Sequence, residues 1–350
     1  TMKKQTFILF IILSVLCVNT QAAKIRALFL GNSYTENNNL PGLVAQFALA
    51  AGDTLEYKSN TPGGHTLQNH FANATSLSLI EEGDWDFVIL QEQSQLPAFP
   101  DGQVAVQMFP YAEMLSDHIK LHNADATVLF YMTWGRKNGD QQNCDLFPPL
   151  CTYEGMDSML QLRYTMMAEY NEAAIAPVAK VWRKLRNDHP GIELYSSDES
   201  HPSNNGSFAA ACTFYAVMFR KDPTQSNYNF TVSPDVADII RNVTKEVVFD
   251  DLSFWYRFVG GSGIGVPTIH SEILLYPNPA SDRLTICVSQ PVTHLVIHDI
   301  TGKEHLTQNI TAHNTDFSLN INHLPAGVYL ISLFDGRKKL RTETVVIDNH

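Results

Sequence analysis

The sequence is short of positive charge and of cysteine, and both shortages narrow its possible functions. Its 350 residues hold 24 Lys and Arg against 36 Asp and Glu, a formal net charge of −12. Nucleic acids and anionic membranes bind basic surfaces, so we expect neither as a partner. The five cysteines show no zinc-site spacing with histidine, and we expect no metal and no other cofactor.

Long apolar runs are also scarce. The run over residues 7–18 is too short for a comfortable membrane span. Lys3 and Lys4 precede it, and small and polar residues follow it to position 23. This order is typical of a secretory signal peptide, so we predict one over residues 1–23 and no membrane span in the mature protein. A retained membrane anchor is the alternative.

Export would permit disulfides, which makes the cysteine positions informative. Cys144 and Cys151 lie close together in a loop-like stretch and are either a disulfide or two free thiols. Cys212 and Cys287 lie in apolar segments and are expected to be core residues.

Short apolar runs alternate with longer helical patterns from residue 24 onward. Strands are predicted over residues 25–30, 55–59, 87–90, 127–132 and 192–195. Helices are predicted over residues 40–51, 67–82, 104–121, a pair within 155–187, and 207–220. Alternation of this kind predicts a mostly parallel sheet with helices on both faces. Ligands of such sheets bind beyond the carboxyl ends of the strands.

The pattern changes after residue 258. Residues 259–270 are a Gly-rich linker, and residues 271–350 hold short alternating runs separated by turn residues. We therefore predict an α/β domain over residues 24–258 and a small C-terminal antiparallel β-sandwich over 271–350.

Two groups of residues could carry chemistry. Ser33 directly follows the first predicted strand in Gly31-Asn32-Ser33, but a hydroxyl becomes a good nucleophile only beside a base. Asp198 and His201, three residues apart, follow the last predicted strand, and a carboxylate so placed can orient an imidazole. Each group alone would more often be a turn or a helix cap. Together they are expected at one edge of the sheet.

Residues 24–256 resemble the SGNH (GDSL-like) hydrolases, whose first block is Gly-Asp/Asn-Ser and whose last is Asp-x-x-His. The resemblance implies a three-layer α/β/α, flavodoxin-like fold and a serine esterase with Ser33, Asp198 and His201 as its triad. Gly64, in Gly-Gly-His-Thr, matches the second block, so the amides of Ser33 and Gly64 would form the oxyanion hole. The Gly-x-Ser-x-Gly elbow of α/β-hydrolases is absent.

The third block departs from the family pattern, which has an Asn as a further oxyanion donor. Here the third strand is followed by Gln91-Glu92-Gln93-Ser94-Gln95. Some acetylesterases of the superfamily have Gln in a similar setting, and a Gln amide carries the same donor. We expect Gln91 to complete the oxyanion hole, with Gln93 and Gln95 as alternatives.

Candidate substrate-binding residues lie beside these blocks: Asn32, Gln93, Trp134, Arg136 and Tyr153. Trp134 could equally be a core residue, and Arg136 a solvated charge. Residues 137–153 look like an insertion that could rim the cleft.

The C-terminal part carries three distinctive motifs, Leu275-Tyr-Pro-Asn-Pro, Asp299-Ile-Thr-Gly-Lys and Leu324-Pro-Ala-Gly-Val-Tyr. They resemble the C-terminal sorting domain of type IX secretion in Bacteroidetes. The resemblance implies type IX secretion machinery as a partner and a secreted or cell-surface location. A carbohydrate-binding or adhesion sandwich is the alternative.

The sequence therefore predicts a secreted serine esterase that acts on a small-molecule or glycan ester, with a carbohydrate O-acetyl group as the substrate implied by the resemblance. A lipase or acyl-thioesterase uses the same scaffold. The alternative of another class is an inactive SGNH-fold protein for glycan binding or surface display.

Overall fold

The computed structural model describes residues 22–259 and most of 273–348, except for 277–279, 289–291, 300–302, 311–315 and 337. The predicted signal peptide and Gly-rich linker lie almost entirely outside the described residues. Within the described ranges, no helix is long and apolar enough to cross a membrane.

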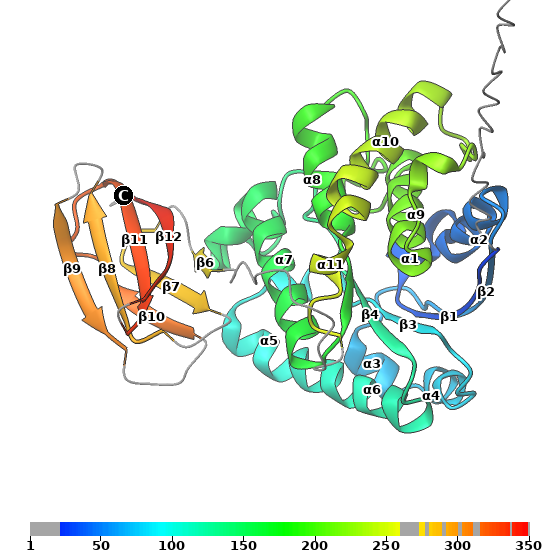
Figure 1. Cartoon of the computed structure of the whole chain (residues 1–350), viewed down its shortest axis with the longest axis horizontal. Helices are drawn as coiled ribbons and strands as arrows, with labels where there is room; N and C mark the ends of the chain where they lie inside the picture. Colours follow the sequence, from blue (N-terminus) through cyan, green and yellow to red (C-terminus); the bar gives the residue numbers. More distant parts are fainter. Residues whose placement is uncertain are drawn as a thin grey trace, which may run out of the picture.

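The N-terminal domain is built on a five-stranded parallel sheet (Figure 1). Its strand order is β2-β1-β3-β4-β5, the flavodoxin-like order of doubly wound folds. The strands are β1 (Lys24–Leu30), β2 (Thr54–Asn60), β3 (Phe87–Leu90), β4 (Thr127–Tyr131) and β5 (Ala174–Ala176). All residues of β3 and β5 are buried, as expected for strands covered on both faces.

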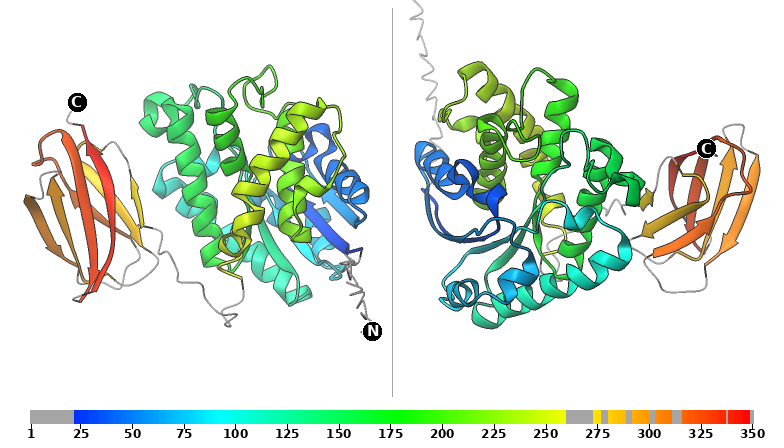
Figure 2. Two further views of the ribbon diagram at one scale, coloured as in Figure 1. Left: turned by 45° about the horizontal axis from the view of Figure 1, so that its top comes forward. Right: turned by 180° about the vertical axis from the view of Figure 1, so that it is seen from behind.

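Helices cover both faces of the sheet, which confirms the predicted three-layer α/β/α fold (Figures 1 and 2). One layer packs together α2 (Leu40–Ala50), α8 (Val178–Asp188), α9 (Asn204–Phe219) and α10 (Pro234–Val247). The other contains α3 (Leu67–Phe71), α4 (Ala74–Ile80), α5 (Asp101–Gln107), α6 (Phe109–His122) and α7 (Tyr153–Tyr170).

Several short helices complete this domain. They are α1 (Ser33–Glu36), α11 (Leu252–Trp255) and the 3₁₀ turns η1 (Asn37–Asn39), η2 (Leu96–Ala98), η3 (Cys144–Leu146), η4 (Pro148–Cys151), η5 (Pro223–Gln225) and η6 (Phe249–Asp251). A disulfide joins Cys144 to Cys151, which answers the question that the sequence left open, and Cys212 is a buried free thiol.

The predicted fifth strand was wrong. β5 lies inside the segment predicted as a helix pair, and its three residues give too short a signal between α7 and α8. Residues 192–195 are instead an irregular segment in which Tyr195 forms an isolated bridge with Pro202. Two predicted helices are also interrupted: Asn73 caps a new helix within residues 67–82, and Pro110 lies in the first turn of α6 within 104–121.

The C-terminal domain is an antiparallel β-sandwich, as predicted (Figure 2). One sheet has the order β10-β7-β6 and the other β12-β11-β8-β9. The strands are β6 (Ile273–Tyr276), β7 (Arg283–Val288), β8 (His294–Asp299), β9 (Glu304–Asn309), β10 (Asp316–Asn320), β11 (Gly327–Asp335) and β12 (Lys338–Ile347). Residues such as Leu295, Ile331 and Val345 form a core of their own, separate from that of the N-terminal domain.

Separate cores predict that the two domains fold independently. A chain ending at Val259 keeps every described residue that packs on the larger core. We expect it to unfold cooperatively, with a Tm within a few degrees of the corresponding transition of the full chain, in a calorimetric scan. Loss of that transition on truncation would show that the domains depend on a shared interface.

Candidate active site

Ser33 lies where β1 ends and the chain turns into α1. It is the first residue of that short helix, and Asn32 caps it by accepting a hydrogen bond from the Tyr34 backbone N–H at 3.1 Å. Capping satisfies a backbone donor that would otherwise lack a partner at the helix start. The turn therefore holds the Ser33 hydroxyl, which is partly exposed, at the carboxyl edge of the sheet.

The structure brings Ser33, His201 and Asp198 together. The His201 Nε2 atom lies 2.8 Å from Ser33 Oγ, and its Nδ1 lies 2.5 Å from Asp198 Oδ2. A carboxylate on Nδ1 fixes the tautomer whose free Nε2 can accept a proton. These three side chains, named from the sequence, form one hydrogen-bonded chain from carboxylate to hydroxyl.

Asp198 is held in its charged form. Partial burial acts to raise its pKa, but the hydrogen bond with His201 and those donated by the backbone N–H groups of Ser200 and His201 outweigh it, so the pKa is lowered. A charged Asp198 can stabilise the imidazolium that forms when His201 takes up a proton.

Asp198 and His201 lie in a tight loop, residues 195–202, that is closed on itself. The Ser196 N–H donates to the His201 carbonyl at 2.8 Å, and the Ser196 hydroxyl to the Pro202 carbonyl at 2.9 Å. The Asn37 amide, from the turn after Ser33, also donates to the Pro202 carbonyl, at 2.7 Å. This last bond ties the histidine loop to the serine turn.

A stack of three aromatic rings packs against the same loop. Trp134 lies between Tyr34 and Trp182, with ring centroids 5.0 and 3.7 Å away, and its indole N–H donates to the Ser200 carbonyl at 3.1 Å. Trp134 is completely buried, so the expected role in substrate binding was wrong. The Tyr34 and His201 rings lie edge to face, with their centroids 5.2 Å apart.

Gln91 does not have the role expected from the sequence. Its side chain is fully buried, and its amide donates to Asn32 Oδ1 at 2.9 Å and to the Glu92 carbonyl at 2.6 Å. Its oxygen accepts from the Asn32 backbone N–H and the Thr35 hydroxyl, both at 2.9 Å. Both N–H groups are therefore taken, so Gln91 holds the serine turn in place instead of facing a substrate oxygen.

Gly31 is required by this arrangement. A Cβ at that position would lie 2.4 Å from Thr35 Oγ1 and 2.7 Å from Gln91 Oε1, too close for either atom. On the other side, the His70 ring donates from Nε2 to the Gly31 carbonyl at 2.8 Å. Burial lowers the pKa of His70 to about 4, so the ring is neutral at physiological pH.

Two of the backbone amides expected in the oxyanion hole have no acceptor of their own in the described structure. Within the described residues, the N–H groups of Ser33 and Gly64 donate no hydrogen bond. Gly64 has φ +70°, a conformation that favours glycine, and it is exposed. The Gln93 amide is partly exposed and makes longer bonds, to Gln95 Oε1 at 3.1 Å and Ser94 Oγ at 3.5 Å. Gln95 donates to Asp140 at 2.7 Å.

The other substrate-binding candidates divide into buried and accessible groups. Tyr153 is only 4% exposed beneath the Arg186 guanidinium, and Asn32 is only 2% exposed, so both side chains lie largely inside the protein. Their role in substrate binding stays a prediction. Arg136 remains partly exposed while it donates to the buried Asp140 at 3.1 Å. The sequence missed the Tyr34 ring and the Asn37 amide, because neither belongs to a family block.

Glu92, next to Gln91, is a buried acid that the sequence analysis did not single out. Its carboxyl accepts from the Gln93 N–H at 2.6 Å and from the Leu67 N–H at the start of α3. Burial raises the pKa of Glu92 to about 8, against the opposing effect of these two donors. The group is therefore protonated at neutral pH.

Comparisons with known proteins follow the two-domain division. Residues 274–348 match the family model of the secretion system C-terminal sorting domain. The curated proteins gave no match. Among solved structures, a DUF4886 family protein from Bacteroides uniformis is similar over 68% of this chain and 97% of its own, with 15% identity and a TM-score of 0.55.

Other similar structures are named as SGNH or GDSL-like hydrolases. One, from Slackia heliotrinireducens, is 28% identical over 56% of this chain and 99% of its own, with a TM-score of 0.47. An acetyl xylan esterase is 14% identical over 55% of this chain and 100% of its own, with a TM-score of 0.39. The Bacteroides likeness supports the α/β fold, and the sorting domain indicates export to the cell surface or medium.

The raised pKa of Glu92 predicts a pH-dependent stability. A carboxyl that is protonated in the folded chain and ionised in the unfolded one makes the free energy of unfolding fall as pH rises from about 4.5 to about 8. The buried His70, whose pKa is lowered by burial, opposes this change mainly below pH 6.5 and only weakly above it. Between pH 6.5 and 8 we expect a loss of about 1–2 kcal/mol in urea unfolding.

Glu92→Gln should flatten this decline, since its oxygen can still accept both backbone donors. The matched control Glu154→Gln, at an exposed position, should keep it. An unchanged pH slope in Glu92→Gln would mean that another group titrates in this range.

Proposed function

We propose that the N-terminal domain is a serine esterase that works through an acyl-enzyme on Ser33, and that its substrates are acetyl esters of carbohydrates. The single observation that carries the proposal is the chain of short contacts, 2.8 Å from Ser33 Oγ to His201 Nε2 and 2.5 Å from His201 Nδ1 to Asp198. A surface turn would not need a histidine held between a carboxylate and a hydroxyl.

In the first step, Ser33 Oγ attacks the ester carbonyl carbon while His201 Nε2 accepts the hydroxyl proton. The resulting imidazolium is stabilised by Asp198, which stays ionised. His201 then gives the proton to the departing alcohol, and the acyl group remains on Ser33. Water, deprotonated by His201, attacks this acyl-enzyme and releases the acid.

The negative charge on the carbonyl oxygen needs donors that are already in place. We assign two of them to the Ser33 and Gly64 amides, which have no other acceptor in the described part of the chain. For a third, Gln93 is the best candidate, because its side chain is partly exposed and its bonds are longer than those of Gln91. Loss of one such donor typically costs about 2.7–4 kcal/mol of transition-state stabilisation.

The open, polar surroundings favour a small acyl group on a polar alcohol. Ser33 and His201 are partly exposed, and Gly63 and Gly64 lie at the surface next to Thr61 and His65. Thr61 donates to the carboxylate of Glu36. An acetyl group on a sugar fits these features, and the exported location would give access to such substrates.

The proposal predicts covalent labelling at one residue. A fluorophosphonate probe should label the wild-type chain, and labelling should fall below detection in Ser33→Ala, detected by gel fluorescence and peptide mass spectrometry. Ser78→Ala is the control, because Ser78 is an exposed serine of α4, a helix that contributes no residue to the Ser33, His201 and Asp198 contacts. It should still react.

No labelling of a folded wild-type chain would favour the alternative, an inactive protein that binds glycans or serves surface display. The saturated hydrogen bonds of Gln91 are the observation that favours this alternative.

Acyl length provides a second test. With matched p-nitrophenyl esters, kcat/KM should fall at least about tenfold from acetyl to octanoyl. A longer acyl chain gains no binding free energy where no apolar site receives it. Acetylated xylan and other acetylated glycans should release acetate, measured enzymatically. A preference for octanoyl would instead indicate a lipase or thioesterase.

A further inference from the structure

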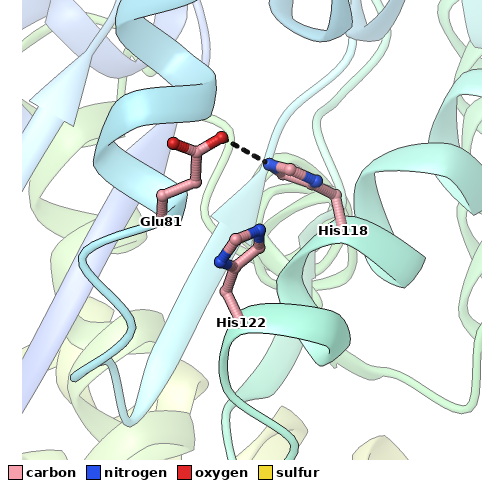
Figure 3. A group of neighbouring side chains, drawn as sticks. All are labelled: Glu81, His118 and His122. Atoms are coloured by element: carbon pink, nitrogen blue, oxygen red, sulfur yellow. Dashed lines mark ion pairs between the residues drawn. The ribbon is translucent and has the colours of Figure 1, made fainter.

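Three potential metal ligands meet on the far side of the sheet from the catalytic residues. Glu81 is the C-terminal cap of α4, and His118 and His122 lie one turn apart in the last turns of α6 (Figure 3). Glu81 precedes β3 and His122 precedes β4, whereas Ser33 follows β1. In a parallel sheet, these positions are at opposite edges.

The side chains converge as a metal site requires. One ligand atom from each residue lies within 4.8 Å of the other two, and His118 Nε2 is 3.4 Å from Glu81 Oε1. Zinc bonds of about 2.0–2.1 Å in tetrahedral geometry place ligand atoms about 3.3–3.4 Å apart. The Glu81–His118 separation already has this value. His122 is exposed, and binding would require its ring to move closer to the other two ligands.

The surroundings of His118 Nε2 give a further indication. The atom is shielded from solvent and makes no hydrogen bond among the described residues, and the Glu81 carboxylate, with which it can form an ion pair, lies 3.4 Å away (Figure 3). Buried polar atoms are nearly always satisfied, and a metal ion bound between the carboxylate and the two imidazoles would satisfy this nitrogen. The His118 and His122 rings lie edge to face, with their centroids 4.6 Å apart.

The local electrostatics also favour a cation. α4 and α6 both end here, and the carboxyl end of a helix carries partial negative charge. The nearby basic side chains are engaged elsewhere: Lys58 pairs with Glu82, and Lys120 donates to the carbonyls of Ala124 and Ala126. No described lysine or arginine side chain therefore pairs with Glu81 in this cluster.

We propose that Glu81, His118 and His122 bind a zinc ion that joins the end of α4 to the end of α6. Two imidazoles and one carboxylate are ligands that Zn²⁺ accepts, with water in the fourth position. The ion would stabilise the two connections into β3 and β4. It would take no part in ester hydrolysis, because it lies at the other edge of the sheet.

Zinc chloride added to the metal-free full chain tests the site. We expect one ion per chain bound with micromolar or tighter affinity in calorimetry, and a Tm raised by several degrees. Cobalt(II) should give the strong visible absorption of a tetrahedral site. His122→Ala should weaken zinc binding more than tenfold without unfolding the chain, since His122 is exposed. His118→Ala should do the same if it folds.

Glu81→Gln and Glu82→Gln form a matched pair. Each removes one carboxylate from the same turn, but only Glu81 is a ligand, so Glu81→Gln should weaken binding and Glu82→Gln should not. If the two variants weakened zinc binding equally, the cluster would act only as a negatively charged surface patch and the proposal would be wrong. Wild-type affinity in His122→Ala, or no binding by the wild type, would overturn the proposal.

Discussion

The approach of Ser33 to His201 depends on the contacts between two distant segments, the serine turn after β1 and the histidine loop at 195–202. Asn37 donates to the Pro202 carbonyl at 2.7 Å, and Tyr34 bonds Ser200 and packs against His201. These bonds hold His201 Nε2 within 2.8 Å of Ser33 Oγ before any substrate is present. Preorganisation of this kind removes much of the entropic cost of aligning a base with a nucleophile.

The serine turn is itself fixed by a buried polar network. Gln91 makes four hydrogen bonds around Asn32, and Gly31 provides the space for its oxygen. Each of these polar groups is satisfied within the protein, as burial demands. Residues 91–95 thus differ from the SGNH pattern in composition, and the buried Gln91 side chain bonds the turn that carries Ser33.

The two edges of the parallel sheet carry different kinds of chemistry. The carboxyl edge holds the partly exposed Ser33 and His201, and the amino edge holds the Glu81, His118 and His122 cluster where two helices end. The two groups lie on different strands of one sheet, because Ser33 follows β1 whereas Glu81 precedes β3 and His122 precedes β4. The C-terminal sorting domain has a separate core, and its family match indicates that it directs export.

Local patterns in the sequence determined the alternation of strands and helices and the C-terminal sandwich, because period and spacing are local properties. The residues Ser33, Asp198 and His201 could be named from family motifs, but only the tertiary structure brings together two segments that lie 168 residues apart. The short β5, the use of Trp134 as a support and the saturation of Gln91 depended on packing between residues far apart in the chain. So did the Glu81 cluster, since only α6 against α4 brings a carboxylate to two histidines. Burial and hydrogen-bond partners are properties of the tertiary structure, and for this reason no spacing rule could assign them.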